Sequence, residues 1–95
     1  MQKSKKRKER RKKEQLSYLR FKSWELMEEA RHALRRKKRD LAIDSLLRAI
    51  RINPEFLEAH LFLGSIYSSK QGYNEALKFL LRAKQIDPEC RELYY

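Results

Sequence analysis

Apolar residues recur every three or four positions from Leu16 onward, the spacing that places side chains on one face of an α-helix. This pattern predicts one long helix that ends at about Lys37. Ahead of it, residues 1–15 contain no aliphatic side chain after Met1, so that segment can bury nothing in a core. The main apolar stripe of the long helix is Leu16, Leu19, Ser23, Leu26, Ala30, Ala33 and Leu34.

Three further helices follow, each bounded by residues that favour turns. We expect helices at about 41–52, 55–70 and 74–86, with Asp40 as the N-cap of the first of them. The prolines of Asn53-Pro54 and Asp87-Pro88 end the helices at 41–52 and 74–86. Gly72 is expected to supply the permissive backbone of the turn between the helices at 55–70 and 74–86. The connections are only two to four residues long, so neighbouring helices should pack antiparallel. Residues 89–95 begin in the register of another helix.

The chain also repeats itself, because the pattern of residues 42–55 returns at residues 76–89. Eight of the fourteen positions are identical between the two segments. A fixed period of about 34 residues is typical of a solenoid built from helical hairpins. The identical pairs are Ala42/Ala76, Leu46/Leu80, Leu47/Leu81, Arg48/Arg82, Ala49/Ala83, Ile52/Ile86, Pro54/Pro88 and Glu55/Glu89.

The second copy resembles a tetratricopeptide (TPR) repeat, whose paired helices alternate large and small residues. Gly64 and Ala76 stand where small residues let the two backbones approach, and Tyr67 and Leu80 stand where larger ones fill the space. His60 occupies a place where an aromatic ring is usual. The other residues that carry the resemblance are Leu63, Tyr73, Ala83 and Pro88.

The first copy resembles the family in its second helix, through Ala42, Leu46, Ala49 and Pro54. Its first helix departs from the pattern, because Glu29 takes a normally apolar position and Lys37-Lys38-Arg39 replaces the usual turn. The resemblance implies an all-α fold of TPR-type hairpins (an α-solenoid), with units at about 23–54 and 57–88. The expected organisation is a basic helix or arm at 1–15, two hairpins at 16–88, and the start of a further or capping helix at 89–95.

The resemblance also implies binding of a protein partner, because the first helix of each TPR unit lines a concave groove. Leu61 and Phe62 either form an apolar trough in that groove beside Ser65 and Ser69, or pack on the preceding helix. The family's clamp for a chaperone C-terminus is missing, because Met27, Arg31, Glu58 and Phe62 hold its places. Carried over by position, the partner groove is Trp24, Met27, Glu28, Arg31, Arg35, Glu58, Leu61, Phe62, Ser65 and Ser69.

Positive charge is concentrated at the start of the chain. Residues 1–39 carry seventeen Lys or Arg and five Glu, a net of +12, whereas the rest has seven Lys or Arg and eight Asp or Glu, a net of −1. Such asymmetry indicates a polyanionic ligand. We expect residues 1–15 to fray in isolation and to become helical when a polyanion neutralises them. The candidate contacts are Lys3, Lys5, Lys6, Arg7, Lys8, Arg10, Arg11, Lys12 and Lys13, with Arg35, Arg36, Lys37, Lys38 and Arg39 at the turn.

The basic run fits a nuclear-import tag, a phosphate-binding arm or a contact with an acidic protein. Tyr18, Phe21 and Trp24 follow at helical spacing and either stack on bases or, in the interpretation we favour, pack on the second helix or on a partner.

Other classes of function find little support. Cys90 is the single cysteine, so no internal disulfide and no thiolate metal site is expected. His32 and His60 lie on different helices without a nucleophile, and Glu28 and Glu29 are adjacent and face different ways, so we expect no enzyme, no cofactor and no small-molecule substrate. No apolar run reaches the length of a membrane span, and the N-terminus is not that of a secreted protein, so a cytoplasmic or nuclear location is expected.

Two functional hypotheses remain. The first is a non-catalytic TPR adaptor that binds a protein and docks its basic arm on a polyanion, with RNA in a ribonucleoprotein assembly as the first choice. The second is a purely protein-binding scaffold whose basic run is a nuclear-import tag or contacts acidic protein tails. Because two units are few for a solenoid, the chain is expected to be the N-terminal piece of a longer TPR protein, a short protein capped by its last turn, or one that completes its core against another chain, with the first and third favoured.

Overall fold

A computed structural model describes residues 2–89, with side chains from Arg11 onward. This part of the chain is all-α. It contains α1 (Gln2–Arg35), α2 (Arg39–Ile52), α3 (Leu57–Ser69) and α4 (Tyr73–Ile86). The predicted further helix at 89–95 falls on residues of which all but Glu89 lie outside the described part.

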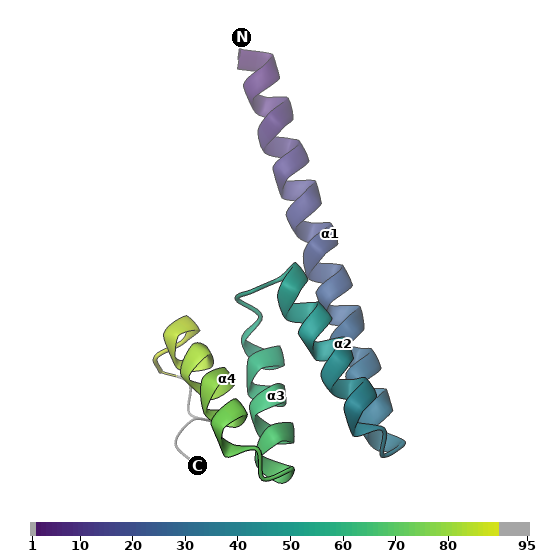
Figure 1. Cartoon of the computed structure of the whole chain (residues 1–95). Helices are drawn as coiled ribbons and strands as arrows, with labels where there is room; N and C mark the ends of the chain where they lie inside the picture. The colour runs from purple at the N-terminus through teal and green to yellow at the C-terminus, as the bar shows by residue number, and fades with distance from the viewer. Residues whose placement is uncertain (1, 90–95) are drawn as a thin grey trace.

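The four helices form two hairpins, α1 with α2 and α3 with α4, joined by contacts between α2 and α3 (Figure 1). The all-α hairpin fold expected from the sequence is therefore confirmed. α1 is much longer than its partner and projects past the rest of the molecule. The molecule, α1 included, measures 56 × 30 × 18 Å.

The backbone of α1 is helical from Gln2, without a break at the end of the basic segment. The sequence predicts that residues 1–15 fray in isolation and become helical when a polyanion neutralises them; the structure has the helical form over residues 2–15, and the fraying stays a prediction. The segment contains neither Gly nor Pro, so nothing in its backbone preference interrupts a helix that begins there and is anchored further along by packing.

Two turns of the same design close the hairpins. After α1, the Lys38 N–H donates to the Ala33 carbonyl at 2.9 Å. After α3, the Gly72 N–H donates to the Tyr67 carbonyl at 2.8 Å. Each turn is a Schellman motif, in which the residue just past the helix adopts the left-handed conformation.

The left-handed residues are Lys37, with φ 61°, and Gln71, with φ 64°. The expectation that Gly72 supplies the permissive backbone is wrong, because its φ is −86°. Gly72 is instead closely approached by neighbouring groups, which would have to move by a few tenths of an ångström to admit a Cβ. A Cβ on it would lie 3.3 Å from Cδ1 of Tyr67 and 3.3 Å from Oε2 of Glu75.

The expectation that Asp40 caps the second helix is also wrong. α2 begins at Arg39, Lys38 holds the N-cap position, and the cap has no side-chain hydrogen bond. Asp40 lies in the first turn, where a carboxylate still favours the positive end of the helix dipole. α3 and α4 likewise begin without a side-chain cap.

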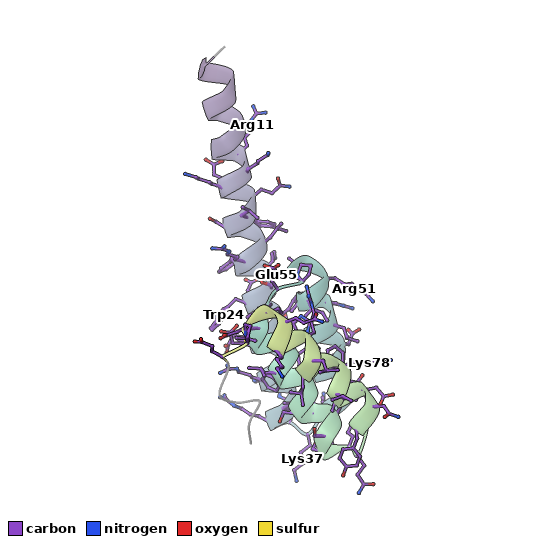
Figure 2. The ribbon with its side chains drawn as sticks, turned by 90° about the vertical axis from the view of Figure 1, so that its left-hand side faces the viewer. Arg11, Trp24, Lys37, Arg51, Glu55 and Lys78 are labelled. Carbon is purple, nitrogen blue, oxygen red and sulfur yellow. The ribbon has the colours of Figure 1, made fainter. Side chains whose placement is uncertain are left out.

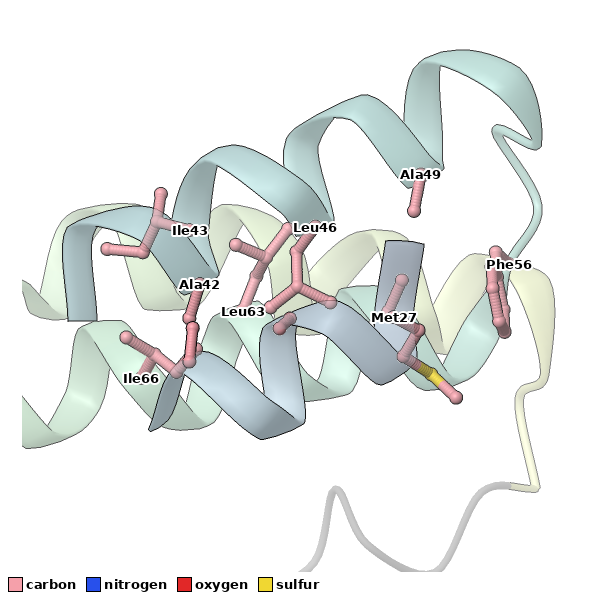
Figure 3. Packing of buried hydrophobic residues seen from close by; sticks show 11 residues of the cluster. Met27, Ala42, Ile43, Leu46, Ala49, Phe56, Leu63 and Ile66 are labelled. Carbon is pink, nitrogen blue, oxygen red and sulfur yellow. The ribbon is translucent and has the colours of Figure 1, made fainter. Parts of the chain in front are cut away.

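A single apolar cluster runs through α1, α2 and α3 (Figure 3). Met27, Leu46 and Leu63 are its largest fully buried apolar side chains, one from each helix. Burial of a side chain of this size contributes about 1.5–3 kcal/mol. The cluster consists of Met27, Ala30, Ala33, Ala42, Ile43, Leu46, Ala49, Phe56, Ala59, Leu63 and Ile66.

The second hairpin closes through small residues, as its resemblance to a TPR unit implies. A Cβ on Gly64 would lie 2.8 Å from Cδ2 of Leu80 and 3.6 Å from the carbonyl of Ala76, so only glycine fits there without a shift of Leu80. Tyr67 stacks on Phe79 of α4, with ring centroids 5.6 Å apart.

His60 occupies the usual aromatic place and is buried. Its ring lies 6.2 Å from that of Phe79, and its Nε2 is 2.8 Å from the Pro54 carbonyl. A carbonyl only accepts, so Nε2 carries the proton. His60 thus ties α3 to the loop that precedes it.

Candidate interaction surfaces

The N-terminal part of α1 presents a basic helical surface. Arg11, Lys12 and Lys13 are exposed, and α1 has no helical neighbour at this end in the described chain. Leu16 is 55% exposed, although it belongs to the predicted apolar stripe, because α2 is too short to reach it. The other arm residues of the prediction lie outside the part whose side chains are described; they are Lys3, Lys5, Lys6, Arg7, Lys8 and Arg10.

The second basic segment, the turn at residues 35–39, lies at the opposite end of the molecule. Figure 2 shows Arg11 and Lys37 far apart. Lys13 and Arg35 are separated by 22 residues of one helix, which corresponds to about 33 Å. Residues proposed together as polyanion contacts therefore form two separate sites. The five cations of the turn, Arg35, Arg36, Lys37, Lys38 and Arg39, are all exposed.

A cleft of about 580 Å³ adjoins the basic turn. Lys70 lies beside it, and its Nζ is 3.3 Å from Oδ1 of Asp40. None of the four salt bridges among the described side chains involves residues 35–39. Their charge is thus offset only in part, by the nearby Asp40. The cleft is lined by Leu34, Lys37, Arg39, Asp40 and Lys70.

Met27 is not part of a partner groove. Its side chain is 0% exposed and lies in the apolar cluster (Figure 3). The prediction fails because it considers α1 by itself. In the structure α3 of the second hairpin contributes to the apolar cluster that encloses Met27.

Trp24 and Glu58, both predicted groove residues, line one cleft of about 400 Å³. The Trp24 indole is 49% exposed and stacks on Phe56, with ring centroids 6.3 Å apart and an interplanar angle of 19°. The cleft combines an aromatic face with carboxylates and one guanidinium. Its lining, the Trp24 cleft below, is Arg20, Ser23, Trp24, Asn53, Glu55, Phe56, Leu57 and Glu58.

Six residues of this lining are not in the predicted groove: Arg20, Ser23, Asn53, Glu55, Phe56 and Leu57. The sequence pattern places Phe56 within a helix, but it is the N-cap of α3. The sequence feature that could have placed Phe56 in the cleft is an aromatic ring two residues after Pro54. No such feature marks Asn53, since an Asn before a Pro indicates only the end of a helix.

The remaining groove residues lie further along the same two helices. The Arg31 guanidinium lies 6.0 Å from the Phe62 ring centroid and 3.8 Å from the Glu28 carboxylate. Phe62 thus packs against the preceding unit. Leu61 and Ser65 line another cleft, of about 340 Å³, with Gly64, Ser68 and Leu80. Ser69 is exposed, and its hydroxyl donates to the Ile66 carbonyl.

Tyr18 and Phe21 do not pack on the second helix. Each is 59% exposed, because α2 ends too early to cover this part of α1. Lys22 lies near Tyr18, with Nζ 6.0 Å from the ring centroid. Of the three aromatic residues in this run, Trp24 alone is in a stacked pair within the described chain.

Across residues 2–89, no helix has the length and hydrophobicity required to cross a membrane. The side chains described there include no group of three His, Cys, Asp or Glu placed to hold a metal ion.

Residues 57–90 match the family model described as the tetratricopeptide repeat. The match covers all of α3 and α4, and its length equals the period of the internal repeat. A search of curated proteins finds no match.

Proposed function

The chain carries a tetratricopeptide repeat, and from that premise we propose that it is a non-catalytic scaffold that binds a protein and docks its basic arm on RNA. TPR units are protein-interaction modules. The protein partner is expected at the exposed faces of α1 and α3, beginning with the Trp24 cleft. RNA in a ribonucleoprotein assembly is the proposed ligand of the arm.

The observation that carries the RNA proposal is the exposure of the cations on the free part of α1. Arg11, Lys12 and Lys13 stand on a helix that has no helical neighbour there, so a duplex or a folded RNA can approach them without steric conflict. The six further cations between Lys3 and Arg10 continue the same basic sequence. Phosphate contacts by a row of cations supply sequence-independent affinity.

The exposed aromatic residues add a second element. Tyr18 and Phe21 follow the cations on the same helix and are 59% exposed. Rings next to a basic row suit stacking on unpaired bases. RNA with single-stranded segments is therefore preferred over a plain duplex.

The test is fluorescence anisotropy with a labelled RNA hairpin across a salt series. If six to nine side chains contact phosphates, the slope of log K against log salt should be about −5 to −8. Substitution of Arg11, Lys12 and Lys13 by Gln should reduce the magnitude of that slope by about 2–3. A matched variant with Gln at Arg36, Lys37 and Lys38 removes equal charge at the far end and should change the slope less.

RNA binding that survives deletion of residues 2–15 would overturn the assignment. The same titration with an acidic peptide addresses the rival function. If the peptide binds more tightly than the RNA at equal salt, the arm is a contact for acidic protein tails.

A further inference from the structure

A small cleft lies between α1 and α2 beside the basic turn, and no residue of α3 or α4 lines it. Its volume is about 210 Å³. Small-molecule sites usually measure about 300–1,000 Å³, so this cleft is the size for one side chain of a longer ligand. The hairpin cleft, as it is called below, includes in its lining Glu29, Ala33 and Arg36 of α1 and, after the turn, Lys38, Leu41 and Ser45.

The two ends of the hairpin cleft differ in charge, because α1 and α2 run antiparallel on either side of the turn (Figure 1). Arg36 and Lys38 flank the turn, so the cations lie at that end. Glu29 stands seven residues before Arg36, which is about 10.5 Å along the helix. Ser45 stands seven residues after Lys38, so it accompanies Glu29 at the far end.

The middle of the hairpin cleft is apolar. Ala33 is 3% exposed and belongs to the apolar cluster, so it closes the cleft on the side of the core. Leu41 is 52% exposed and forms part of the wall, with His32 near it. An apolar group that entered the cleft would remove the Leu41 side chain from water, which is favourable.

The cations of the basic turn divide between two clefts. Arg36 and Lys38 line the hairpin cleft, whereas Lys37 and Arg39 line the cleft of about 580 Å³ together with Asp40. No salt bridge among the described side chains includes Arg36 or Lys38. The cationic end of the hairpin cleft therefore offers two charges that a ligand can neutralise.

We propose that the hairpin cleft binds a short peptide segment of a partner protein, in which one apolar side chain lies between an acidic and a basic residue. The acidic side chain contacts Arg36 and Lys38. The apolar side chain packs on Leu41, and the basic side chain faces Glu29. An extended chain rises about 3.3 Å per residue, so the acidic and basic residues are about three positions apart. This site is additional to the Trp24 cleft and to the RNA-binding arm.

A peptide matches this order of groups, whereas RNA does not. RNA supplies phosphates for the cations but no cation for Glu29 and no aliphatic side chain for Leu41. The last residues of the chain do not have the order either, because Arg91 and Glu92 are adjacent and both precede Leu93.

The probes are two blocked, fluorescent peptides, with the central sequences Glu-Leu-Ser-Lys and Lys-Ser-Leu-Glu between serines. Both are used because the cleft does not fix the direction of the peptide chain. Anisotropy titration with the full chain should give saturable binding of one of them. Replacement of its leucine by serine should weaken binding at least about tenfold, because the apolar contact is lost.

Two double variants remove equal charge from the same turn. Arg36→Gln with Lys38→Gln, the cleft variant, should weaken peptide binding at least about tenfold, because both partners of the acidic side chain are lost. Lys37→Gln with Arg39→Gln, the control variant, should change it less than about threefold, because those cations line the other cleft. Gln is tolerated at position 37, since Gln71 adopts the same conformation.

Two single substitutions test the rest of the cleft. Glu29→Gln should weaken binding of the peptide with lysine but not of an analogue that has glutamine in place of that lysine. Leu41→Ser should weaken binding of both. Leu81→Ser is its matched control, because Leu81 is also 52% exposed but lies on α4.

The absence of saturable binding, or an equal loss in the cleft and control variants, would overturn the proposal. Circular dichroism checks that each variant keeps the fold. A loss of peptide binding in the variant with Gln at Arg11, Lys12 and Lys13 would place the peptide on the arm, which also overturns it.

Two further outcomes concern other occupants. If the labelled RNA hairpin loses more affinity in the cleft variant than in the control variant, the cleft holds phosphate and the proposal fails. A dimer in sedimentation that the cleft variant dissociates would show that a second copy fills the cleft, and the proposal fails again. RNA binding to the arm is measured without the peptide, so failure of this proposal leaves the proposed function standing.

Discussion

Glycine at either left-handed turn residue should stabilise the protein. Lys37 and Gln71 adopt φ 61° and φ 64° in the two Schellman turns. A residue with a Cβ pays about 1–2 kcal/mol for this conformation. Glycine avoids that cost but raises the entropy of the unfolded chain, which is worth about 0.5–1 kcal/mol. The net expected gain is about 0.5–1 kcal/mol for each of Lys37→Gly and Gln71→Gly.

The two sites can be tested together. The turns are joined by the pair between Lys70 and Asp40, whose Asp40 side chain is 95% exposed, and exposed pairs contribute little. The gains should therefore add to about 1–2 kcal/mol in the double variant. For a domain of this size, each kcal/mol corresponds to a shift of about 4–8 °C in Tm. Urea unfolding followed by circular dichroism gives the free energy, and calorimetry gives Tm.

Alanine at each position is the control. Lys37→Ala removes the same charge from the basic turn as Lys37→Gly but keeps the Cβ, so the comparison isolates the backbone contribution from charge repulsion. Gln71→Ala does the same at a site where charge is not involved. If the glycine variants are no more stable than the alanine variants, the left-handed turns do not store this strain and the reasoning fails.

Three other outcomes follow from the packing. Leu46→Ala should lower the free energy of unfolding by about 2–5 kcal/mol, because the Leu46 side chain is fully buried. Leu80→Ala, at the equivalent position of the second repeat, should lower it less, because Leu80 is only partly buried. Urea unfolding of the two variants compares these losses. Phe56→Ala should raise acrylamide quenching of the single tryptophan, since it removes the ring that stacks on Trp24; unchanged quenching would contradict that contact. Ile43→Ala should destabilise the chain more than Leu77→Ala, because Ile43 is 9% exposed and Leu77 is 55% exposed; thermal unfolding of the two variants compares them, and equal losses would contradict the difference in packing.

Much of the fold follows from local pattern. The internal repeat, the two prolines and the small residues at Gly64 and Ala76 are sufficient to predict hairpins and their closure, because each reflects contacts within one unit. The two repeats are equivalent even in their turns, where Lys37 and Gln71 adopt the same left-handed conformation although their side chains differ in charge.

The predictions from the sequence fail at residues whose burial depends on whether another helix or hairpin packs on them. Met27 has the same pattern position as Leu61, yet one is buried and the other lines a cleft, because only the first has a hairpin stacked on it. Phe21 looks like a packing residue by spacing alone, but α2 ends too early to meet it. Residue type alone favours Gly72 for the left-handed turn, whereas the hydrogen-bond register places that conformation one residue earlier.

The uninterrupted course of α1 has a consequence for how anything held at its tip is oriented. A single helix of 34 residues, about 51 Å long, runs from the basic tip into the core without a hinge. A ligand bound at the tip is therefore held at a fixed angle about the axis of α1 relative to the hairpins. Each residue added between Gln15 and Leu16 should rotate that ligand about the axis by about 100° and move it outward by about 1.5 Å. Two added alanines would turn it nearly to the opposite side, while seven would restore its phase at greater reach.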